Sequence, residues 1–374
     1  MTDAREIPFL DLGAVNAPYA GELHSAAARV IDSGRYVGGA EVEAFEAELA
    51  AFTGTKYAVG TANGLDALRL ILRGYIELGR LSPGDEVIVA ANTYIASVLA
   101  ITDCGLRPVL VEPDARTLNL DTSRIEASLT PRTRAVMPVH LYGRACHDAA
   151  LEAVAARYGL TVIEDNAQAI GARSALDGRR TGSLGHAGAF SFYPTKNVGA
   201  LGDAGAVTTD DADLARAVRA LANYGSDRRY HNIYRGLNSR LDPLQAAFLR
   251  VKLPHTDAEN ARRRSLAALY DAEIDSQAVV KPLFTGDDMV WHQYVILADD
   301  RDGLRRYLAE RGAGTDVHYA VPPHRQPCYA AAFGEASFPV TENLAGRVLS
   351  LPISRGTSED DARRVASIIN QFGK

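Results

Sequence analysis

The feature that most constrains the fold of this 374-residue chain is an alternation of helical and strand-like segments up to about residue 206. Apolar residues at helical spacing in EVEAFEAELAAFTG precede the strand-like KYAVGTANG and a second amphipathic segment, LDALRLILRGYIELG. DEVIVAANTY and IASVLAITDCG repeat this order, and RPVLVEPD, RTRAVMPVHLYG and TVIEDNA are further strand candidates. Alternating strands and helices favour an α/β architecture with a mainly parallel sheet.

The pattern changes after residue 206, where three helical segments follow one another: DADLARAVRALANYG, RLDPLQAAFLRVKL and the charged TDAENARRRSLAALYDAEI. We therefore place a domain boundary near residue 255, with a large α/β domain in residues 1–255 and a small α+β domain in residues 256–374. In the small domain we expect a helix at DGLRRYLAERG, a strand at TDVHYA and a final helix that begins at Ser358.

Composition excludes several classes of protein. The net charge of -6 leaves no basic surface for nucleic acid. Cys104, Cys146 and Cys328 form an odd, widely spaced set, which indicates reduced thiols in a cytoplasmic protein. We find no signal peptide and no apolar stretch of membrane-spanning length. Although His140 and His147 lie near Cys146, no second cluster completes a ligand set, so we expect no metal site.

A lysine and an aspartate stand out because each follows or closes an apolar strand. Lys196 comes shortly after AGAFSFY, and Asp165 ends TVIED. Burial lowers the pKa of a lysine amine and prepares it for Schiff-base chemistry. The pair is typical of pyridoxal phosphate enzymes, in which a carboxylate keeps the ring nitrogen protonated. We therefore expect catalytic roles for both, with Lys196 also acting as the base that moves the substrate proton.

Other segments match the remaining parts of this cofactor. The turn TANGLDAL, with Asn63 and Gly64, opens a helix whose backbone N–H groups suit a phosphate, and Ser191 can add a hydroxyl. Tyr94 follows a strand end and either stacks on the pyridine ring or is an ordinary core or rim tyrosine; both interpretations stay open. Gln168 is placed to reach the phenolic oxygen of the ring.

Taken in order, PFLDL, SGRYVGG, NGLDAL, VIEDNAQAIGA, FSFYPTKNVGALGDAGAV, GLNSRLDPLQAA and VHYAVPPH resemble the DegT/DnrJ/EryC1/StrS family of sugar aminotransferases over nearly the whole chain. The resemblance implies a fold-type-I pyridoxal phosphate enzyme, with a mainly parallel seven-stranded sheet between helices and a smaller α+β domain. It also implies a homodimer with shared active sites. The substrates would be a nucleotide-linked keto sugar and L-glutamate.

The resemblance also assigns roles to individual residues. Lys196 is the Schiff-base residue and Asp165 the pyridinium partner, and the other cofactor contacts are Gln168, Tyr94, Gly64, Leu65, Ser191 and, from the second subunit, Asn238. Leu65 stands where relatives carry a small hydroxyl residue, so only its backbone N–H can serve the phosphate. Arg240 either fixes its loop or meets an anionic substrate group. Contacts to the sugar nucleotide are expected from Tyr36, His140, Tyr142, His318, Tyr319 and His324, each of which has a structural interpretation as well.

The ketone that is aminated is the least constrained point. NGLDALRL and NTYIASVLAITDCGL resemble relatives that act on the 3-keto-6-deoxyhexoses of dTDP, so we expect a dTDP-3-amino-3,6-dideoxyhexose for a surface polysaccharide or a natural product. Amination at C4 is the alternative. A regulatory protein that holds the cofactor without turnover would need an added DNA-binding segment. A sugar dehydratase of this family would carry histidine in place of Lys196, and a nicotinamide enzyme would need a strand that opens into GxGxxG.

Overall fold

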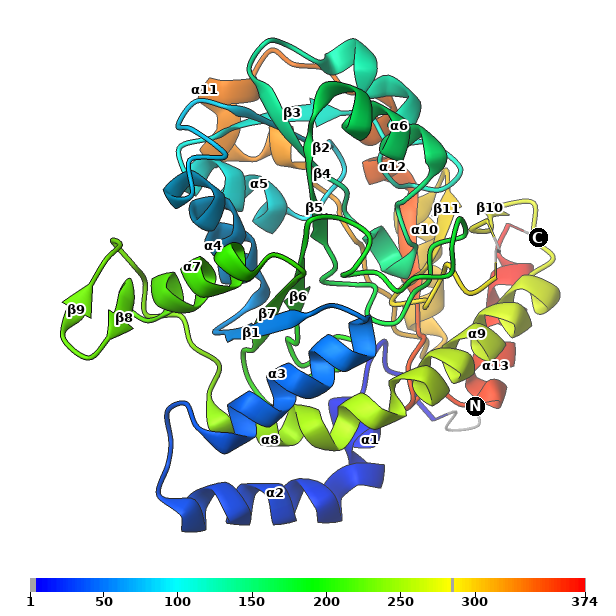
Figure 1. Ribbon diagram of the computed structural model, residues 1–374. Coiled ribbons are helices and arrows are strands. Elements are labelled where there is room, and N and C mark those ends of the chain that lie inside the picture. Colours follow the sequence, from blue (N-terminus) through cyan, green and yellow to red (C-terminus); the bar gives the residue numbers. More distant parts are fainter. Residues whose placement is uncertain (1–4, 284–285, 374) are drawn as a thin grey trace.

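A seven-stranded sheet forms the centre of the computed structural model, which describes residues 5–283 and 286–373 (Figure 1). Its strand order is β1-β7-β6-β5-β4-β2-β3. The strands are β1 (Tyr57–Thr61), β2 (Glu86–Ala90), β3 (Arg107–Val111), β4 (Thr133–Met137), β5 (Thr161–Asp165), β6 (Ala187–Ser191) and β7 (Gly205–Thr209). The pairs from β3 to β6 are parallel, and only β7 runs against its neighbours β6 and β1. The prediction of a mainly parallel α/β sheet is confirmed.

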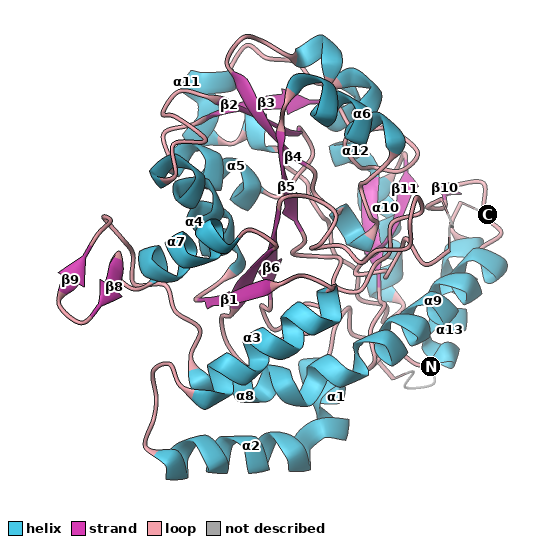
Figure 2. Ribbon diagram, viewed as in Figure 1, coloured by secondary structure: helices cyan, strands magenta, loops and turns pink. Residues whose placement is uncertain are grey.

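Helices cover both faces of this sheet, because alternate residues of each strand point to opposite sides. Val59 and Val207 enter a core with α4 and α7, whereas their neighbours Ala58 and Ala206 enter a core with α3 and α8. The helices of this part are α1 (Leu12–Asn16), α2 (Ala20–Ser33), α3 (Ala40–Thr53), α4 (Gly64–Glu77), α5 (Ile95–Asp103), α6 (Ala149–Tyr158), α7 (Ala212–Ala222) and α8 (Pro243–Lys252). Figure 2 shows the resulting helix, sheet and helix layers.

The C-terminal part combines helices with a second sheet. The strands are β10 (Val279–Val280), β11 (Tyr294–Ala298) and β12 (Val348–Leu351), and the helices are α9 (Thr256–Glu273), α10 (Arg301–Glu310), α11 (Ala330–Phe333), α12 (Pro339–Arg347) and α13 (Glu359–Gln371). Ser358 caps α13 in a reciprocal pair with Asp361, which confirms the predicted helix start. The first described residues also join this part, since Ile7 forms backbone hydrogen bonds with Gly312 and Gly314. The boundary near residue 255 stays a prediction.

The predicted strand TDVHYA is wrong. Only Asp316 pairs in this segment, with Ser350 of β12. The chain then turns, because the Tyr142 hydroxyl donates to the carbonyl of His318 and the side-chain amide of Gln168 donates to the Tyr319 hydroxyl at 3.0 Å. These contacts draw the segment away from the sheet. A second difference is the unpredicted hairpin of β8 (Ser226–Arg228) and β9 (His231–Asn232), which projects from the body of the molecule (Figure 1).

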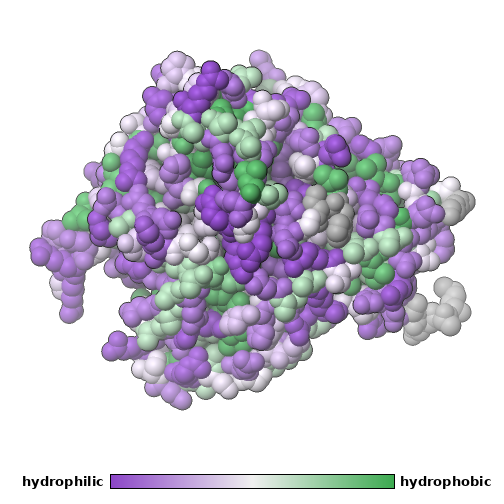
Figure 3. Space-filling view, turned by 45° about the vertical axis from the view of Figure 1, so that its right-hand side comes forward, coloured by the Kyte–Doolittle hydropathy of each residue, from purple (hydrophilic) through white to green (hydrophobic). Residues whose placement is uncertain are grey.

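The molecular surface is mixed in character. Figure 3 shows a face on which hydrophilic residues predominate and apolar residues form scattered patches. No helix within the described ranges combines the length and the apolar character that crossing a bilayer requires.

A buried carboxylate ties β5 to the loop that precedes β6. Glu164 is 1% exposed; it accepts hydrogen bonds from the backbone N–H groups of Gly182, Leu184 and Gly185 at 2.7 to 2.8 Å and from His140 Nε2 at 2.8 Å. Burial by itself raises the pKa of Glu164, but the hydrogen bonds that its carboxylate accepts from His140 and from the backbone N–H groups together lower it. The ionised form is therefore the one that stabilises the fold.

Glu164→Gln is expected to lower the free energy of unfolding by about 3 kcal/mol near neutral pH, because an amide nitrogen then faces buried donors. Since the folded state lowers the pKa of Glu164, its contribution is complete above the pKa of an unfolded glutamate, about 4.3, and is lost as the pH falls through the folded value. The difference in unfolding free energy between wild type and variant should thus be smaller in acid than at neutral pH. Urea unfolding at neutral pH and at a pH below the folded pKa measures it. The exposed Glu310→Gln serves as control, and a difference that is the same at both pH values contradicts the assignment.

Candidate active site

A cavity of about 500 Å³ opens where β5 and β6 end. Parallel neighbours bring their carboxyl ends to one edge of a sheet, and Asp165 pairs in register with Ala189, two residues before β6 ends. The predicted residues that line the cavity are Gly64, Leu65, Tyr94, Asp165, Gln168, Ser191, Lys196 and Tyr319. The structure therefore brings together five separate segments of the chain.

Lys196 and Asp165 supply an amine and a carboxylate to this cavity. Burial lowers the pKa of Lys196 to about 8, and the charge of Asp165 raises it in part. Asp165 is 5% exposed and fixed on both oxygens: Oδ2 accepts from the Ser97 hydroxyl at 2.7 Å, and Oδ1 accepts from the Ala167 N–H at 3.1 Å. The cavity thus holds an amine that is partly neutral near physiological pH beside an immobile carboxylate.

The loop that carries Lys196 is anchored by residues that the sequence analysis missed. The side-chain amide of Asn197 donates to Asn260 Oδ1 at 2.9 Å and to the Val290 carbonyl at 3.1 Å, and its oxygen accepts from His292 Nδ1 at 3.1 Å. Burial keeps the pKa of His292 well below its usual value, so the ring is neutral. The one signal in the sequence was the place of Asn197 directly after the lysine.

The start of α4 forms an anion site at one end of the cavity. The side chain of Asn63 caps the helix by accepting from the Asp66 N–H at 2.8 Å, and in the described part of the chain the N–H groups of Gly64 and Leu65 make no hydrogen bond. A Cβ on Gly64 would lie 2.6 Å from Ser191 Cβ, so only glycine lets the turn approach β6 this closely. Free backbone donors, the helix dipole and the serine hydroxyl suit a phosphate group.

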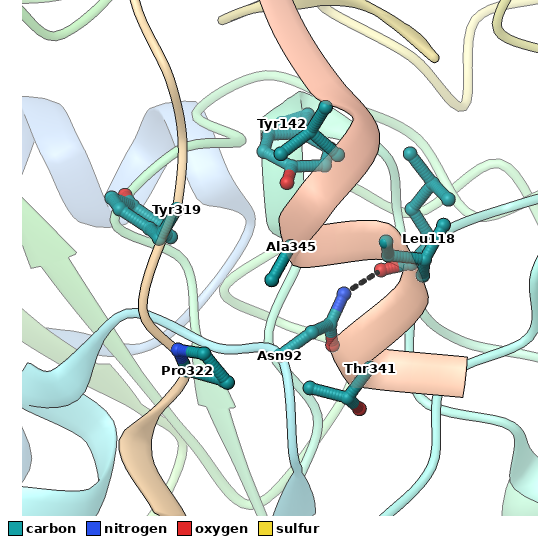
Figure 4. Close-up of a pocket in the computed structure, with 9 residues that line it drawn as sticks. Asn92, Leu118, Tyr142, Tyr319, Pro322, Thr341 and Ala345 are labelled. Atoms are coloured by element: carbon teal, nitrogen blue, oxygen red, sulfur yellow. Dashed lines mark hydrogen bonds between the residues drawn. The ribbon is translucent and has the colours of Figure 1, made fainter. Parts of the chain in front are cut away.

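Aromatic side chains line another side of the cavity. The rings of Tyr94 and Tyr319 lie 5.0 Å apart between centroids, and Tyr94 is half exposed. Gln168 is held at both ends, because its nitrogen donates to the Tyr319 hydroxyl at 3.0 Å and its oxygen accepts from the Tyr142 N–H at 2.6 Å. Figure 4 shows Tyr142 and Tyr319 approaching from different segments beside a small neighbouring pocket. Tyr142 therefore positions Gln168 and does not itself line the cavity.

The model of the DegT/DnrJ/EryC1/StrS aminotransferase family matches residues 19–370. The chain belongs to this family. It is 49% identical to dTDP-3-amino-3,6-dideoxy-alpha-D-galactopyranose transaminase of Aneurinibacillus thermoaerophilus, over 98% of this chain and 99% of that protein. The crystal structure of DesV from S. venezuelae aligns with a TM-score of 0.94 and 47% identity over 99% of both chains. The structure of ntda from Bacillus subtilis with bound cofactor PMP aligns with a TM-score of 0.89 and 30% identity, over 99% of this chain and 86% of that one.

Two histidines that were expected to contact the sugar nucleotide lie elsewhere in this DegT/DnrJ/EryC1/StrS aminotransferase. His140 is fully buried: its Nδ1 accepts from the Cys146 N–H at 2.9 Å, which leaves Nε2 to donate to Glu164. His324 is 1% exposed, and its Nε2 bonds Glu342 at 3.0 Å. Neither side chain lines the cavity. We correct both assignments to structural roles.

Two further residues of the family motifs lie outside the cavity of their own chain. Tyr36 is 59% exposed in the loop between α2 and α3, where its hydroxyl donates to the Ile31 carbonyl at 3.1 Å. Asn238 is exposed, although the next residue, Ser239, accepts from the Ala62 N–H at 3.3 Å beside the anion site. Neither side chain lines the cavity.

Arg240 and His318 have partners inside the protein. Arg240 donates to Asn223 Oδ1 at 2.7 Å and lies over the ring of Tyr224, which favours the interpretation that it fixes its loop. His318 Nδ1 bonds Ser350 Oγ at 2.8 Å, and burial lowers its pKa, with a smaller contribution from the charge of Lys196. His318 therefore lies near the lysine without lining the cavity.

Asp165→Asn is expected to move the pKa of Lys196 below the wild-type value of about 8, because the variant removes the charge that raises it. The measurement is the rate at which an amine-reactive reagent modifies Lys196 in cofactor-free protein, followed by peptide mass spectrometry across the pH range. Modification should rise with pH through about 8 in wild type and at lower pH in the variant. Asp203→Asn, which removes another carboxylate lining the cavity, should leave the profile unchanged. An unchanged or raised midpoint in Asp165→Asn would overturn this account of the pair.

Proposed function

We propose that this protein is a pyridoxal phosphate-dependent aminotransferase that converts a dTDP-3-keto-6-deoxyhexose into a dTDP-3-amino-3,6-dideoxyhexose, with L-glutamate as amino donor. The observation that carries the proposal is the Lys196 amine, with a pKa of about 8, beside the fixed Asp165 carboxylate in one cavity. The substrate class follows the name of the Aneurinibacillus thermoaerophilus relative. The free thiols in the described chain accord with a cytoplasmic enzyme.

The residues of the cavity fit pyridoxal phosphate. Lys196 would hold it covalently, Asp165 would meet the ring nitrogen, and the start of α4 with Ser191 would bind the phosphate through the two free N–H groups and the hydroxyl. Tyr94, half exposed on the cavity wall, offers a face for the ring. When bound, the cofactor withdraws the electrons that remain on the substrate carbon after its proton leaves.

Lys196 moves that proton. An amine whose pKa is about 8 exists in both protonation states near neutral pH, so it can take a proton from the amino donor and return one to the sugar carbon. Apolar side chains on the cavity wall, including Leu65, Val139 and Leu141, limit the water that could compete for the proton. Asp165 keeps its place throughout because Ser97 and the backbone hold both oxygens.

A homodimer completes the proposed site. Asn238 is exposed and does not line the cavity of its own chain, so we expect its contact with the phosphate to reach the cavity of a second copy of the chain. The projecting β8–β9 hairpin, in which Tyr230 is 87% exposed, gives a second copy a surface to cover. Two alternatives to this function are amination at C4 and a regulatory protein that binds the cofactor without turnover. The assay of purified protein described next distinguishes them.

Purified wild type is expected to bind pyridoxal phosphate and, with L-glutamate, to aminate dTDP-3-keto-6-deoxyhexose. Because Lys196 supplies the only side-chain amine among the described residues that line the cavity, Lys196→Ala should neither attach the cofactor nor form product. NMR of the product locates the new C–N bond. Amination of the 4-keto sugar alone would replace the C3 assignment, and cofactor uptake without product from either sugar would favour the regulatory alternative.

Asn238→Ala is expected to weaken cofactor retention roughly tenfold, the loss of one hydrogen bond to a charged group. If the site is shared, a dimer of one Asn238→Ala chain and one Lys196→Ala chain contains one intact site, because each chain supplies the residue that the other lacks. At a limiting cofactor concentration, coexpressing the two chains should therefore restore part of the cofactor retention and activity that the Asn238→Ala dimer loses. As a control, one chain carrying both substitutions is paired with wild type. Absence of rescue, or a monomer by light scattering, would refute the shared site.

A further inference from the structure

We propose that the hydroxyl groups of Thr93 and Ser97 form a relay that orients the Asp165 carboxylate toward the ring nitrogen of the cofactor. Ser97 is then a positioning residue for transamination, and Thr93 supports it. The inference rests on the proposed function, since it concerns the partner of a bound pyridoxal phosphate. It adds two residues to the site that do not themselves face the cavity.

The contacts form a chain that ends at the carboxylate. Thr93 Oγ1 lies 2.9 Å from Ser97 Oγ, and Ser97 Oγ lies 2.7 Å from Asp165 Oδ2. An ionised carboxylate only accepts hydrogen bonds, so the Ser97 proton points to Asp165. Thr93 must then be the donor to Ser97. The two hydrogen bonds therefore run in one direction, from Thr93 through Ser97 to Asp165.

Burial makes this relay strong. Thr93 and Ser97 are each 1% exposed and Asp165 is 5% exposed, so little water competes for these hydrogen bonds. Because Oδ1 is held by the Ala167 N–H, the serine fixes the second oxygen and with it the plane of the carboxylate. A carboxylate held at one oxygen only could rotate away from the ring nitrogen.

The segment that carries Thr93 and Ser97 also carries Tyr94, one of the aromatic residues that line the cavity. Tyr94 lies between the two hydroxyl residues, and its carbonyl accepts from the Ser97 N–H at 3.2 Å. The preceding Asn92 donates from its side chain to the Leu118 carbonyl at 2.8 Å, the contact drawn in Figure 4. One anchored turn thus sets both the ring that would stack on the cofactor and the hydroxyl that holds Asp165.

The test compares Ser97→Ala, Ser97→Cys, Thr93→Val and wild type for pyridoxal phosphate affinity, visible circular dichroism per bound cofactor, and kcat and KM. Thr53→Val is the matched control, because Thr53 is equally buried but its hydroxyl donates to Leu49 within α3. Ser97→Ala should bind the cofactor roughly three- to tenfold more weakly and lower kcat with little change in the KM for the sugar. Ser97→Cys, with a weaker donor, should fall between Ser97→Ala and wild type, and Thr93→Val should show a smaller effect than Ser97→Ala.

A purely structural role predicts a different result. In that case Ser97→Ala lowers thermal stability as Thr53→Val does, while cofactor affinity and circular dichroism per bound cofactor stay at wild-type values, and the proposal is overturned. If Ser97→Ala does not fold, Thr93→Val decides: a changed dichroism supports the relay, and an unchanged one refutes it. Failure of wild type to take up the cofactor would instead refute the proposed function, and the inference with it.

Discussion

The parallel pairing of β5 with β6 is the constraint on which the site depends. Its register places Asp165 opposite Ala189, so the carboxylate and the chain that leads through Ser191 to Lys196 leave the sheet at the same edge. Strand geometry then separates two adjacent acids. Glu164 and Asp165 point to opposite faces, so the first is used to hold a buried loop and the second faces the cavity.

The position of Lys196 depends on contacts from outside the sheet as well. Asn197, next to the lysine, bonds Asn260 of α9 and His292 before β11, so the C-terminal part of the chain holds the lysine loop from one side. The buried Lys252 of α8 donates to the carbonyl of Gly199 from another. Tyr319 also comes from the C-terminal part and closes the cavity next to Gln168. Both parts of the chain therefore shape one site.

The sheet and the pair of Lys196 and Asp165 could be predicted because each is marked by residues that are neighbours in the sequence. Each parallel strand is a short apolar run, and Lys196 and Asp165 are polar residues that follow or end such runs. The failures concern partners far away in sequence. The sequence predicted that His140 contacts the substrate, but its ring is hydrogen-bonded to the buried Glu164. It also predicted a strand at TDVHYA, but hydrogen bonds with Tyr142 and Gln168 hold this segment in a turn. The sequence shows that Thr93 and Ser97 are four residues apart, but it does not show that Ser97 is hydrogen-bonded to Asp165, 68 residues further along the chain.

The burial that lowers the pKa of Lys196 connects stability with chemistry. A shift from 10.5 to about 8 means that holding the charged amine in the cavity costs on the order of 3 kcal/mol relative to the unfolded chain. Because the folded value is the lower one, this cost is full below about pH 8 and disappears as the pH rises toward 10.5. This cost is the net value, in which the charge of Asp165 already offsets part of the effect of burial. A cofactor held covalently by Lys196 would bind only the folded chain, so its binding would stabilise the fold as well as complete the site.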